Sequence, residues 1–473
     1  MKIGLIRASL PSYFPETHGV WDAAERMLET LCADLGCTLH VASDIPMDGA
    51  QTQIVLDEFS GQDVDFVLLL HGGFTMGDVA RTVAASQFRC GFWSVPEPVR
   101  TGDVQLNNFV SLNMSMSIAR QVRDLSKRPL QWYHGSPASH GLQSRLSSTL
   151  RAIKAAKALE GARIGVIGGL AMTFYNMEVS TSELRARLGV EIVHHDIHEL
   201  TKRMADINAA SVANQVTAMA NAAQISGVSN AQMSLTARAA LALKDMAEAG
   251  DYDALAVSDW PALQNDPGMH PGAAFTWLEE THNLPVASEG DVLGAITQLV
   301  ARVLTGRVGY LLDMTEPDLD AAQLLVWHGG GGPLYLADEA GAKWINHPMI
   351  GRGTEEGPIY GAISDLVFQD GPVTLFRIAR NAGAFFGMTG TIAGRDPSGF
   401  AGCRGWLEGF EIDGQAASLE DVVASVMAHG LEHHFVLVPG DVAGVLTEFA
   451  SWTGMEILGH IPMRDHLDAR DFT

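Results

Sequence analysis

Three residues that could perform acid–base or metal chemistry lie along one stretch of the sequence, and each ends an apolar run. Glu289 ends a short run that begins at Leu284, Asp313 ends a second run, and His328 follows a third and leads into four glycines and a proline. Carboxylates and imidazoles transfer protons near neutral pH and bind divalent cations through oxygen and nitrogen. The stretch 284–333 therefore predicts a metal site or an acid/base site.

The elements between these residues predict that they meet in space. Residues 292–305 have the length and apolar spacing of a helix. Glu289 and Asp313 therefore end the two strands of a strand–helix–strand unit. Such a unit returns the chain to the same sheet, which would place both carboxylates at the carboxyl ends of neighbouring strands. The alternative is structural, because an acid or serine at a strand end often caps the next helix, as Ser288 or Asp291 could.

The rest of the pattern predicts an α/β protein in three parts. Runs such as 2–7 and 65–70 alternate with helical spacing, which is typical of a doubly wound parallel sheet, and a second such series begins at residue 163. After Asp313 the strands become short and glycine frequent, as in an antiparallel, barrel-like β domain. We predict domains at residues 1–160, at 161–310 with Glu289, and at 311–473 with His328, Arg404 and His434.

Composition restricts the partners of the chain. Its 55 acidic residues outnumber 31 lysines and arginines, and a net charge of −24 would repel a phosphate backbone, so nucleic acid is not expected. No apolar run reaches the roughly 18 residues that span a membrane, and the first residues turn polar too early for a signal peptide. We therefore predict a cytoplasmic protein that does not associate with membranes. The four cysteines lack the paired spacing of a disulfide framework or a thiolate zinc site.

Three further polar residues are candidates for binding a substrate. His71 follows an apolar run and precedes two glycines, and Asn113 lies in an amide-rich segment, so both could bind sugar-like hydroxyl groups. Arg404 stands among small residues in an otherwise apolar region and could orient a substrate. Each has a structural alternative, because histidine and asparagine also form turns and caps, and an arginine can pair with a structural acid.

Two groups of histidines could bind a metal. His194 and His195 lie on one predicted strand with His198 just beyond it, and adjacent strand residues point to opposite faces. We therefore interpret this group as exposed residues of an edge strand. His433 and His434 precede a strand at 435–438, and the pattern alone leaves open whether they bind a metal or lie on the surface.

The order of several short motifs resembles that of the L-fucose/L-arabinose isomerase superfamily. The motifs are Ser288-Glu289-Gly290-Asp291, Asp313, Trp327-His328-Gly329, Gly402-Cys403-Arg404 and His433-His434, with further likeness at Leu112–Ser115 and Leu159–Ile167. The resemblance covers most of the chain. It implies two Rossmann-like domains followed by a β-rich domain. Asp313 matches the fucose branch, whereas the arabinose branch has glutamate there, and the four glycines after His328 depart from both branches, so the resemblance does not identify the sugar.

The resemblance also implies roles for individual residues. Glu289 and Asp313 would bind the metal and act as the acid/base pair, and His434 would be an imidazole ligand in preference to His433. His328 matches a ligand of the arabinose branch. Arg404, His71 and Asn113 would orient the remaining hydroxyl groups of the sugar.

The implied activity is the interconversion of an aldose and a ketose. The substrate would be a free, unphosphorylated sugar, the reaction would pass through an enediolate, and the cofactor would be Mn²⁺, with Mg²⁺ or Co²⁺ as substitutes. The resemblance further implies a homo-oligomer, such as a hexamer with shared active sites. Two alternatives from other classes are an epimerase or carbon–carbon lyase that uses the same metal site, and a sugar-binding module without activity.

Overall fold

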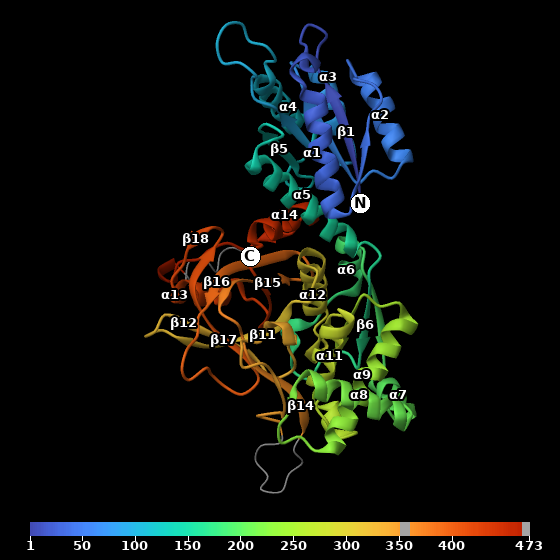
Figure 1. Cartoon of the computed structure of the whole chain (residues 1–473), viewed down its shortest axis with the longest axis vertical. Coiled ribbons are helices and arrows are strands. Elements are labelled where there is room, and N and C mark those ends of the chain that lie inside the picture. Colours follow the sequence, from blue (N-terminus) through green and yellow to red (C-terminus); the bar gives the residue numbers. More distant parts are fainter. Residues whose placement is uncertain (351–359, 466–473) are drawn as a thin grey trace. The chain divides into compact units, whose positions relative to one another are not determined.

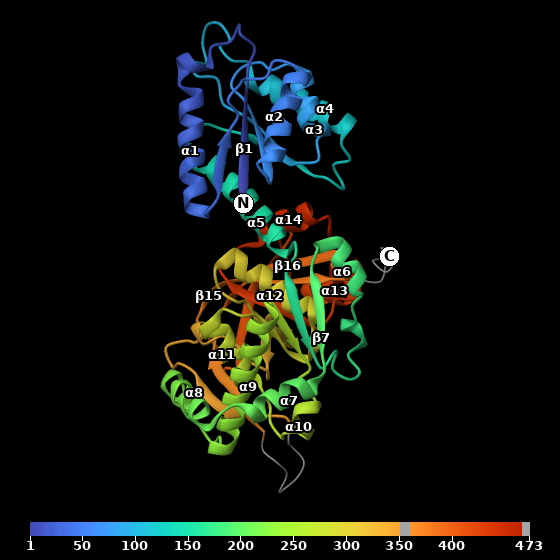
Figure 2. The ribbon, with the colours of Figure 1, turned by 90° about the vertical axis from the view of Figure 1, so that its right-hand side faces the viewer.

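The computed structural model describes residues 1–350 and 360–465, and Figures 1 and 2 show it from two sides. The chain forms two compact units. The first comprises Met1–Lys157 with Glu448–Gly454, and the second comprises Ala158–Thr447 with Met455–Thr473. Within the described residues, no helix combines the length and apolar character needed to cross a membrane.

The first unit is built on a parallel sheet with strand order β2-β1-β3-β4-β5. Its strands are β1 (Lys2–Ala8), β2 (Thr38–Val41), β3 (Phe66–His71), β4 (Arg89–Ser94) and β5 (Leu130–His134). They alternate with α1 (Val20–Leu35), α2 (Gly49–Gly61), α3 (Gly77–Ala85), α4 (Asn108–Val122) and α5 (His140–Leu159). Figure 2 shows α1 on one side of the strands and α2, α3 and α4 on the other. The predicted doubly wound sheet is confirmed.

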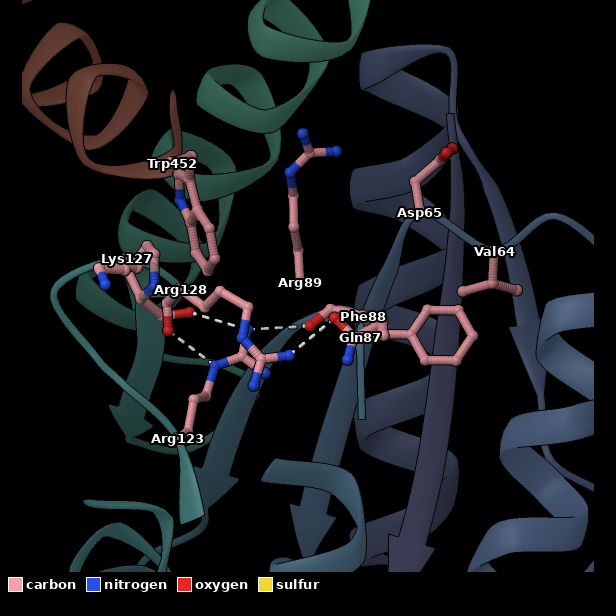
Figure 3. A pocket seen from close by; sticks show the side chains of 10 residues that line it. Val64, Asp65, Gln87, Phe88, Arg89, Arg123, Lys127, Arg128 and Trp452 are labelled. Atoms are coloured by element: carbon pink, nitrogen blue, oxygen red, sulfur yellow. Dashed lines mark hydrogen bonds between the residues drawn. The ribbon is translucent and has the colours of Figure 1, made fainter. Parts of the chain in front are cut away.

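A basic pocket of about 370 Å³ lies at the amino ends of these strands (Figure 3). Arg123 and Arg128 line it beside Trp452, which belongs to the same unit. The Arg123 guanidinium donates to the carbonyl oxygens of Ala84 at 3.1 Å and Phe88 at 3.0 Å. Because these bonds tie neighbouring segments together, Arg123 supports the fold, and parallel sheets bind their ligands at the opposite, carboxyl edge.

The second unit begins with a smaller parallel sheet of order β10-β9-β6-β7. Its strands are β6 (Arg163–Ile167), β7 (Glu191–His195), β9 (Ala254–Val257) and β10 (Val286–Ala287). Its helices are α6 (Thr181–Leu188), α7 (Ile197–Asp206), α8 (Ala209–Ala222), α9 (Asn230–Gly250), α10 (Ala262–Asn265), α11 (Gly272–His282) and α12 (Val292–Thr305). Apolar residues at helical spacing bury α12 almost completely, so it packs between this sheet and the strands that follow.

The remaining strands form a mixed sheet in which six antiparallel strands close on themselves. The ring runs β16-β15-β19-β11-β12-β17 and returns to β16. These strands are β11 (Tyr310–Asp318), β12 (Gln323–His328), β15 (Gly371–Ala379), β16 (Ala384–Ile392), β17 (Cys403–Ile412) and β19 (His434–Pro439). The predicted antiparallel, barrel-like region is therefore confirmed, and its interior holds residues such as Leu312, Leu375 and Phe386.

Shorter elements extend or cover the ring. They are β8 (Gln224–Ile225), β13 (Lys343–Asn346), β14 (Gly361–Val367), β18 (Gln415–Ala416), β20 (Glu456–Ile457), α13 (Leu419–His429) and α14 (Ala443–Thr453). β14 pairs in parallel with β17, and β13 joins β14 to β8 from the preceding part of the chain. The division into three domains at residues 160 and 310 stays a prediction.

One prediction about strand pairing is wrong. Glu289 and Asp313 were expected at the carboxyl ends of neighbouring strands in one parallel sheet, but β10 belongs to the parallel sheet and β11 to the antiparallel ring. Asp313 also does not end its strand, because β11 continues to Asp318 through an irregularity after Met314. Apolar periodicity identifies a strand, but its partners depend on segments far away in the sequence.

A buried acid in α11 gives this unit a testable pH dependence. Glu279 accepts a hydrogen bond from Gln298 Nε2 at 2.7 Å, and burial raises its pKa from 4.5 to about 8. Between these values the folded state holds a proton that the unfolded state has lost, so stability falls as the pH rises. Glu279→Gln lacks this titration. The free energy of unfolding of the variant minus that of wild type should therefore increase from about pH 5 to pH 8, by at most about 1.4 kcal/mol per pH unit.

Urea unfolding of both proteins across this pH range measures the difference. Glu248→Gln on the exposed face of α9 is the matched control and should follow the wild type at every pH. If the free energies of unfolding of Glu279→Gln and wild type change in parallel with pH, Glu279 is ionised in the folded protein across this range.

Candidate metal centre

Three segments of the second unit bring the candidate ligands together. Glu289 lies in the short turn Ser288–Gly290 between β10 and α12, and Asp313 lies on β11. His434 begins β19, where it stands directly opposite Asp313 in the antiparallel pair. The cluster therefore forms where the carboxyl edge of the parallel sheet meets the antiparallel ring.

The ligand atoms of this cluster lie at distances that suit a shared cation. Glu289 Oε2 is 3.4 Å from His434 Nε2 and 3.3 Å from His433 Nε2, and the ligand atoms of these three residues lie within 4.8 Å of one another. Asp313 Oδ1 lies 3.8 Å from His434 Nε2. Carboxylate oxygen and imidazole nitrogen form a donor set suited to Mn²⁺, Mg²⁺ or Co²⁺.

Two atoms of the cluster lack a hydrogen-bond partner. Within the residues that the structure describes, His434 Nε2 and Asp313 Oδ1 are both buried and make no hydrogen bond. A buried polar atom without a partner costs free energy, and a cation between an imidazole nitrogen and a carboxylate oxygen would satisfy both. The residues present therefore fit a divalent metal ion.

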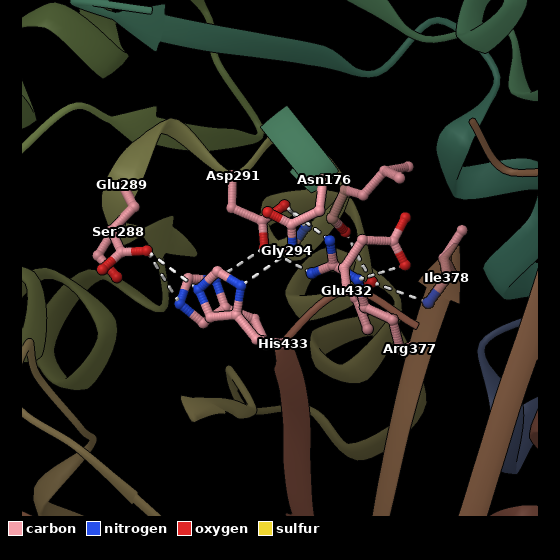
Figure 4. A network of polar contacts seen from close by, with 12 residues as sticks. Asn176, Ser288, Glu289, Asp291, Gly294, Arg377, Ile378, Glu432 and His433 are labelled. Atoms are coloured by element: carbon pink, nitrogen blue, oxygen red, sulfur yellow. Dashed lines mark hydrogen bonds and ion pairs between the residues drawn. The ribbon is translucent and has the colours of Figure 1, made fainter. Parts of the chain in front are cut away.

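A buried network behind His434 sets the orientation of its ring (Figure 4). His434 Nδ1 donates to Asp291 Oδ2 at 3.0 Å, so Nε2 is the nitrogen left to bind a cation. Asp291 is also bound by both terminal nitrogens of Arg377, at 2.5 and 3.0 Å, and it caps α12 through the Gly294 N–H. His434, Asp291 and Arg377 are all fully buried. The helix-capping alternative for Asp291 is therefore correct, and the same carboxylate also supports the candidate ligand.

The charges of this network shift the pKa values of its members. Burial alone would raise the pKa of Asp291, but Arg377 and then His434 outweigh it and hold that pKa below its ordinary value. Burial likewise lowers the pKa of His434, but its bond to Asp291 and the nearby carboxylates raise it overall. Burial raises the pKa of Asp313, against the effect of His434. Asp313 is thus a stronger base than an ordinary aspartate.

The backbone of Glu289 is held in a left-handed conformation, with φ 60° and ψ 12°. Its N–H donates to Asp259 Oδ1 at 2.6 Å, and its carbonyl accepts from the Ala171 N–H at 2.9 Å. Burial and then the charge of Glu289 raise the pKa of Asp259 to about 7. A non-glycine residue in this conformation costs about 1 kcal/mol or more, so these bonds hold a strained turn that presents the carboxylate.

His328 lies beside the cluster but in a different hydrogen-bonded state. Its Nδ1 accepts from the Gly330 N–H at 2.8 Å, and because a backbone N–H can only donate, the proton of the neutral ring is on Nε2. That N–H lies 3.5 Å from Ser288 Oγ. His433 Nδ1 lies 3.1 Å from Asn176 Nδ2, and its Nε2 donates to Glu289 Oε2 at 3.3 Å, so His433 contacts a carboxylate of the cluster directly. The geometry thus favours His433 over His328 as a ligand.

The three predicted substrate-binding residues belong to different units, Arg404 to the second and His71 and Asn113 to the first. Arg404 Nη1 donates to Asp365 at 2.5 Å and to the Gly402 carbonyl at 2.8 Å, so it pairs with a structural acid. His71 is buried against Thr75 Oγ1 at 3.0 Å with its pKa lowered by burial to about 3, whereas Asn113 is exposed on α4. Their roles in substrate binding stay predictions.

The interpretation of the other histidine group as exposed residues holds for His194 and His198, whereas His195 is half-buried and its Nε2 lies 2.7 Å from the Tyr252 hydroxyl. β7 is an edge strand of its sheet, and His194 and His198 are exposed. His195 Nδ1 lies 3.0 Å from Glu199 and His198 Nδ1 lies 2.9 Å from Asp196, which are local ion pairs.

Several residues of the site were not predicted from the sequence. They are Asp259, His270, His347 and Arg377, with Asp291 predicted only as a cap. Arg377 had the clearest signal, because it is a single charge in the otherwise apolar segment Val373–Ala379 and such a charge must be paired when buried. His270 and His347 each precede a proline, which marks a turn but not a site.

Cation binding separates ligands from supporting residues. After EDTA treatment, wild type should bind Mn²⁺ as measured by the loss of the free-ion EPR signal. His434→Ala should weaken binding by more than about 100-fold, and Asp291→Asn by about 10- to 100-fold, as expected for a residue that orients a ligand without contacting the cation. His195→Ala is the control and should bind as wild type. Equal binding by His434→Ala and wild type would contradict the assignment of this site.

Comparison with curated proteins identifies relatives across most of the chain. The sulfoquinovose isomerase of Priestia aryabhattai is 26% identical over 413 residues, which is 86% of this chain and 88% of the relative. The proteins of that name from Alkalicoccus urumqiensis and Clostridium sp. (strain MSTE9) are 27% and 26% identical, over 75% and 80% of this chain and 77% and 83% of their own lengths. No protein-family model matches. The chain is thus related to sugar isomerases, and the narrower likeness to the L-fucose/L-arabinose isomerase superfamily stays a prediction.

Proposed function

We propose that this protein is an aldose–ketose isomerase that acts on a free, unphosphorylated sugar. The observation that carries the proposal is the pair of carboxylates, Glu289 and Asp313, that both approach the unpartnered His434 Nε2. The relationship to sugar isomerases supports the same reaction class.

The proposed metal site consists of Glu289, Asp313 and His434, with His433 as a further ligand. Mn²⁺ is the proposed ion, and Mg²⁺ or Co²⁺ would suit the same oxygen and nitrogen donors. A divalent cation there would supply positive charge beside the carbonyl and hydroxyl oxygens of the sugar, which acidifies the C–H bond between them. The buried Asp291 and Arg377 keep His434 oriented toward that position.

The two carboxylates would perform the proton transfer. One carboxylate removes the proton from C2 of the open-chain aldose to give the enediolate. The proton of the C2 hydroxyl then passes to the C1 oxygen, and the other group, as its carboxylic acid, protonates C1, so that the C2 oxygen becomes the ketone. Asp313 suits the proton-carrying role because burial raises its pKa. The turn at Glu289 holds its carboxylate against His433 and His434.

The first substrate to test is sulfoquinovose, because the relatives carry its name. A panel of pentoses, 6-deoxyhexoses and hexoses should accompany it, since identities near 26% leave room for a changed sugar. NMR of the product in D₂O distinguishes the reaction types. An isomerase yields a ketose, whereas an epimerase returns an aldose with inverted C2.

Substitution of either carboxylate should abolish most of the activity. Glu289→Gln and Asp313→Asn keep the size of each side chain but remove the base, and loss of a general acid or base typically lowers kcat by about 10²- to 10⁴-fold. EDTA should remove wild-type activity and Mn²⁺ should restore it. Steady-state kinetics on the accepted sugar measures both effects, with Glu248→Gln as the control.

Near-wild-type rates in either carboxylate variant would refute the acid/base assignment. Activity that is unaffected by EDTA would refute the metal role.

We further propose a homo-oligomer, such as a hexamer, with active sites shared between subunits. On this proposal His71 and Asn113 would serve a neighbouring subunit. Light scattering measures the assembly, and mixing His71→Ala with Glu289→Gln subunits should partly restore activity, because some sites would combine two intact contributions. A fully active monomer would exclude shared sites.

A further inference from the structure

Three buried histidines form a row next to the candidate metal centre. His270 precedes α11, His328 ends β12 and His347 follows β13. The rings of His270 and His347 lie 4.5 Å apart, and the ring of His328 lies 5.3 Å from that of His434. His328 therefore borders the cluster that contains Glu289. His347 lies next to His328, because a Cβ on the adjacent Gly329 would lie 2.8 Å from His347 Nε2.

Each of the three histidines makes the same kind of local hydrogen bond, and this bond determines which ring nitrogen carries the proton. In each, Nδ1 accepts from the backbone N–H two residues later in the chain. The bonds run from Gly272 to His270 at 3.2 Å, from Gly330 to His328 at 2.8 Å and from Met349 to His347 at 3.1 Å. Because a backbone N–H can only donate, each neutral ring must carry its proton on Nε2. The row thus presents three Nε2–H donors.

The four glycines after His328 allow the row to form. A Cβ at Gly329 would lie 2.8 Å from His347 Nε2, and a Cβ at Gly330 would lie 2.6 Å from the His328 ring. A Cβ on Gly272 would lie 1.4 Å from the Gly330 carbonyl oxygen. Side chains at these positions would separate the three histidines, so the run of glycine is explained by close packing.

The neighbours of the row complete a surface suited to hydroxyl groups. Asp259 Oδ2 lies 3.5 Å from His270 Nε2, and its other oxygen binds the Glu289 N–H, so an acceptor stands among the donors. The histidines are buried and retain 3%, 7% and 8% of their surface. Because Nδ1 of each ring accepts a backbone N–H, that nitrogen carries no proton and each ring is uncharged. Uncharged donors beside a carboxylate acceptor favour hydroxyl groups, which can both donate and accept, over an anion.

We propose that His270, His328 and His347 bind the hydroxyl oxygens of the sugar beyond the two carbons held at the metal centre, and so contribute to substrate specificity. This proposal rests on the proposed function, because it takes the Glu289 cluster as the place where the carbonyl end of the sugar binds. It makes His328 a hydrogen-bond donor to the substrate and not a metal ligand.

Paired substitutions at His347 test the row. Glutamine keeps an N–H donor close to the position of Nε2, whereas leucine removes it. The measurement is calorimetric titration of the Mn²⁺-loaded protein with pentitols and hexitols. His347→Leu should weaken the tightest of these by about three- to tenfold, the effect of one neutral hydrogen bond, whereas His347→Gln should stay close to wild type. Both variants should keep wild-type Mn²⁺ affinity by EPR, as should the control His194→Leu.

A second pair of measurements tests the role of His328. His328→Gln should keep wild-type Mn²⁺ affinity, because on this proposal His328 donates to the sugar and does not bind the cation. A loss of more than about tenfold would show that His328 is a ligand and overturn its place in the row. In kinetics with the accepted sugar, His270→Leu and His347→Leu should raise KM more than they lower kcat, because each removes one donor.

The outcomes distinguish this proposal from the proposed function. If the wild type binds polyols only with Mn²⁺ and His347→Leu binds them equally well, the row is overturned and the metal site stands. Loss of Mn²⁺ affinity in His347→Leu would show a structural role and also overturn the row. If the Mn²⁺-loaded wild type binds none of the polyols and turns over no sugar, both proposals fail.

Discussion

The candidate centre depends on one buried ion pair, between Asp291 and Arg377. Asp291 opens α12 at the end of the parallel sheet, Arg377 lies in the middle of β15, and both are fully enclosed. Removing one partner would leave an unpaired charge in the interior, which is far more costly than losing a surface pair. The bond therefore holds α12 against the antiparallel ring, and the remaining lone pairs of Asp291 orient His434. One interaction serves the fold and the site together.

A second constraint is the close approach of backbone segments around Glu289. Its left-handed turn is held from one side by Asp259 and from the other by Ala171, and a Cβ at Gly290 would lie 2.0 Å from the Gly169 carbonyl oxygen. Strain of this kind persists only where the surroundings hold it, and it is frequent at functional sites. The turn brings a carboxylate from the parallel sheet to the histidines of β19, which a relaxed helix cap would not do.

The electrostatics of the site are consistent with a place for a cation. Glu289 and Asp313 approach the same imidazole nitrogen, and in the described part of the chain the nearest guanidinium of the network, Arg377, is already paired with Asp291. Two carboxylates that converge without a cation repel each other, and a divalent ion would reverse that effect. The uncharged histidine row lies beside this region, so the proposed site combines a charged end and a neutral, hydrogen-bonding end.

Local pattern in the sequence determined the elements and the ligand types, and tertiary structure decided how they combine. The helix at 292–305 and the strand that ends at His328 follow from apolar periodicity, which needs only neighbouring residues. The pairing of Asp313 with His434, the burial of Arg377 against Asp291 and the proton position on His328 all depend on residues or turns that no periodicity encodes. Such pairings arise from packing between segments far apart in the chain, so only the folded structure separates a ligand from a helix cap or a hydrogen-bond donor.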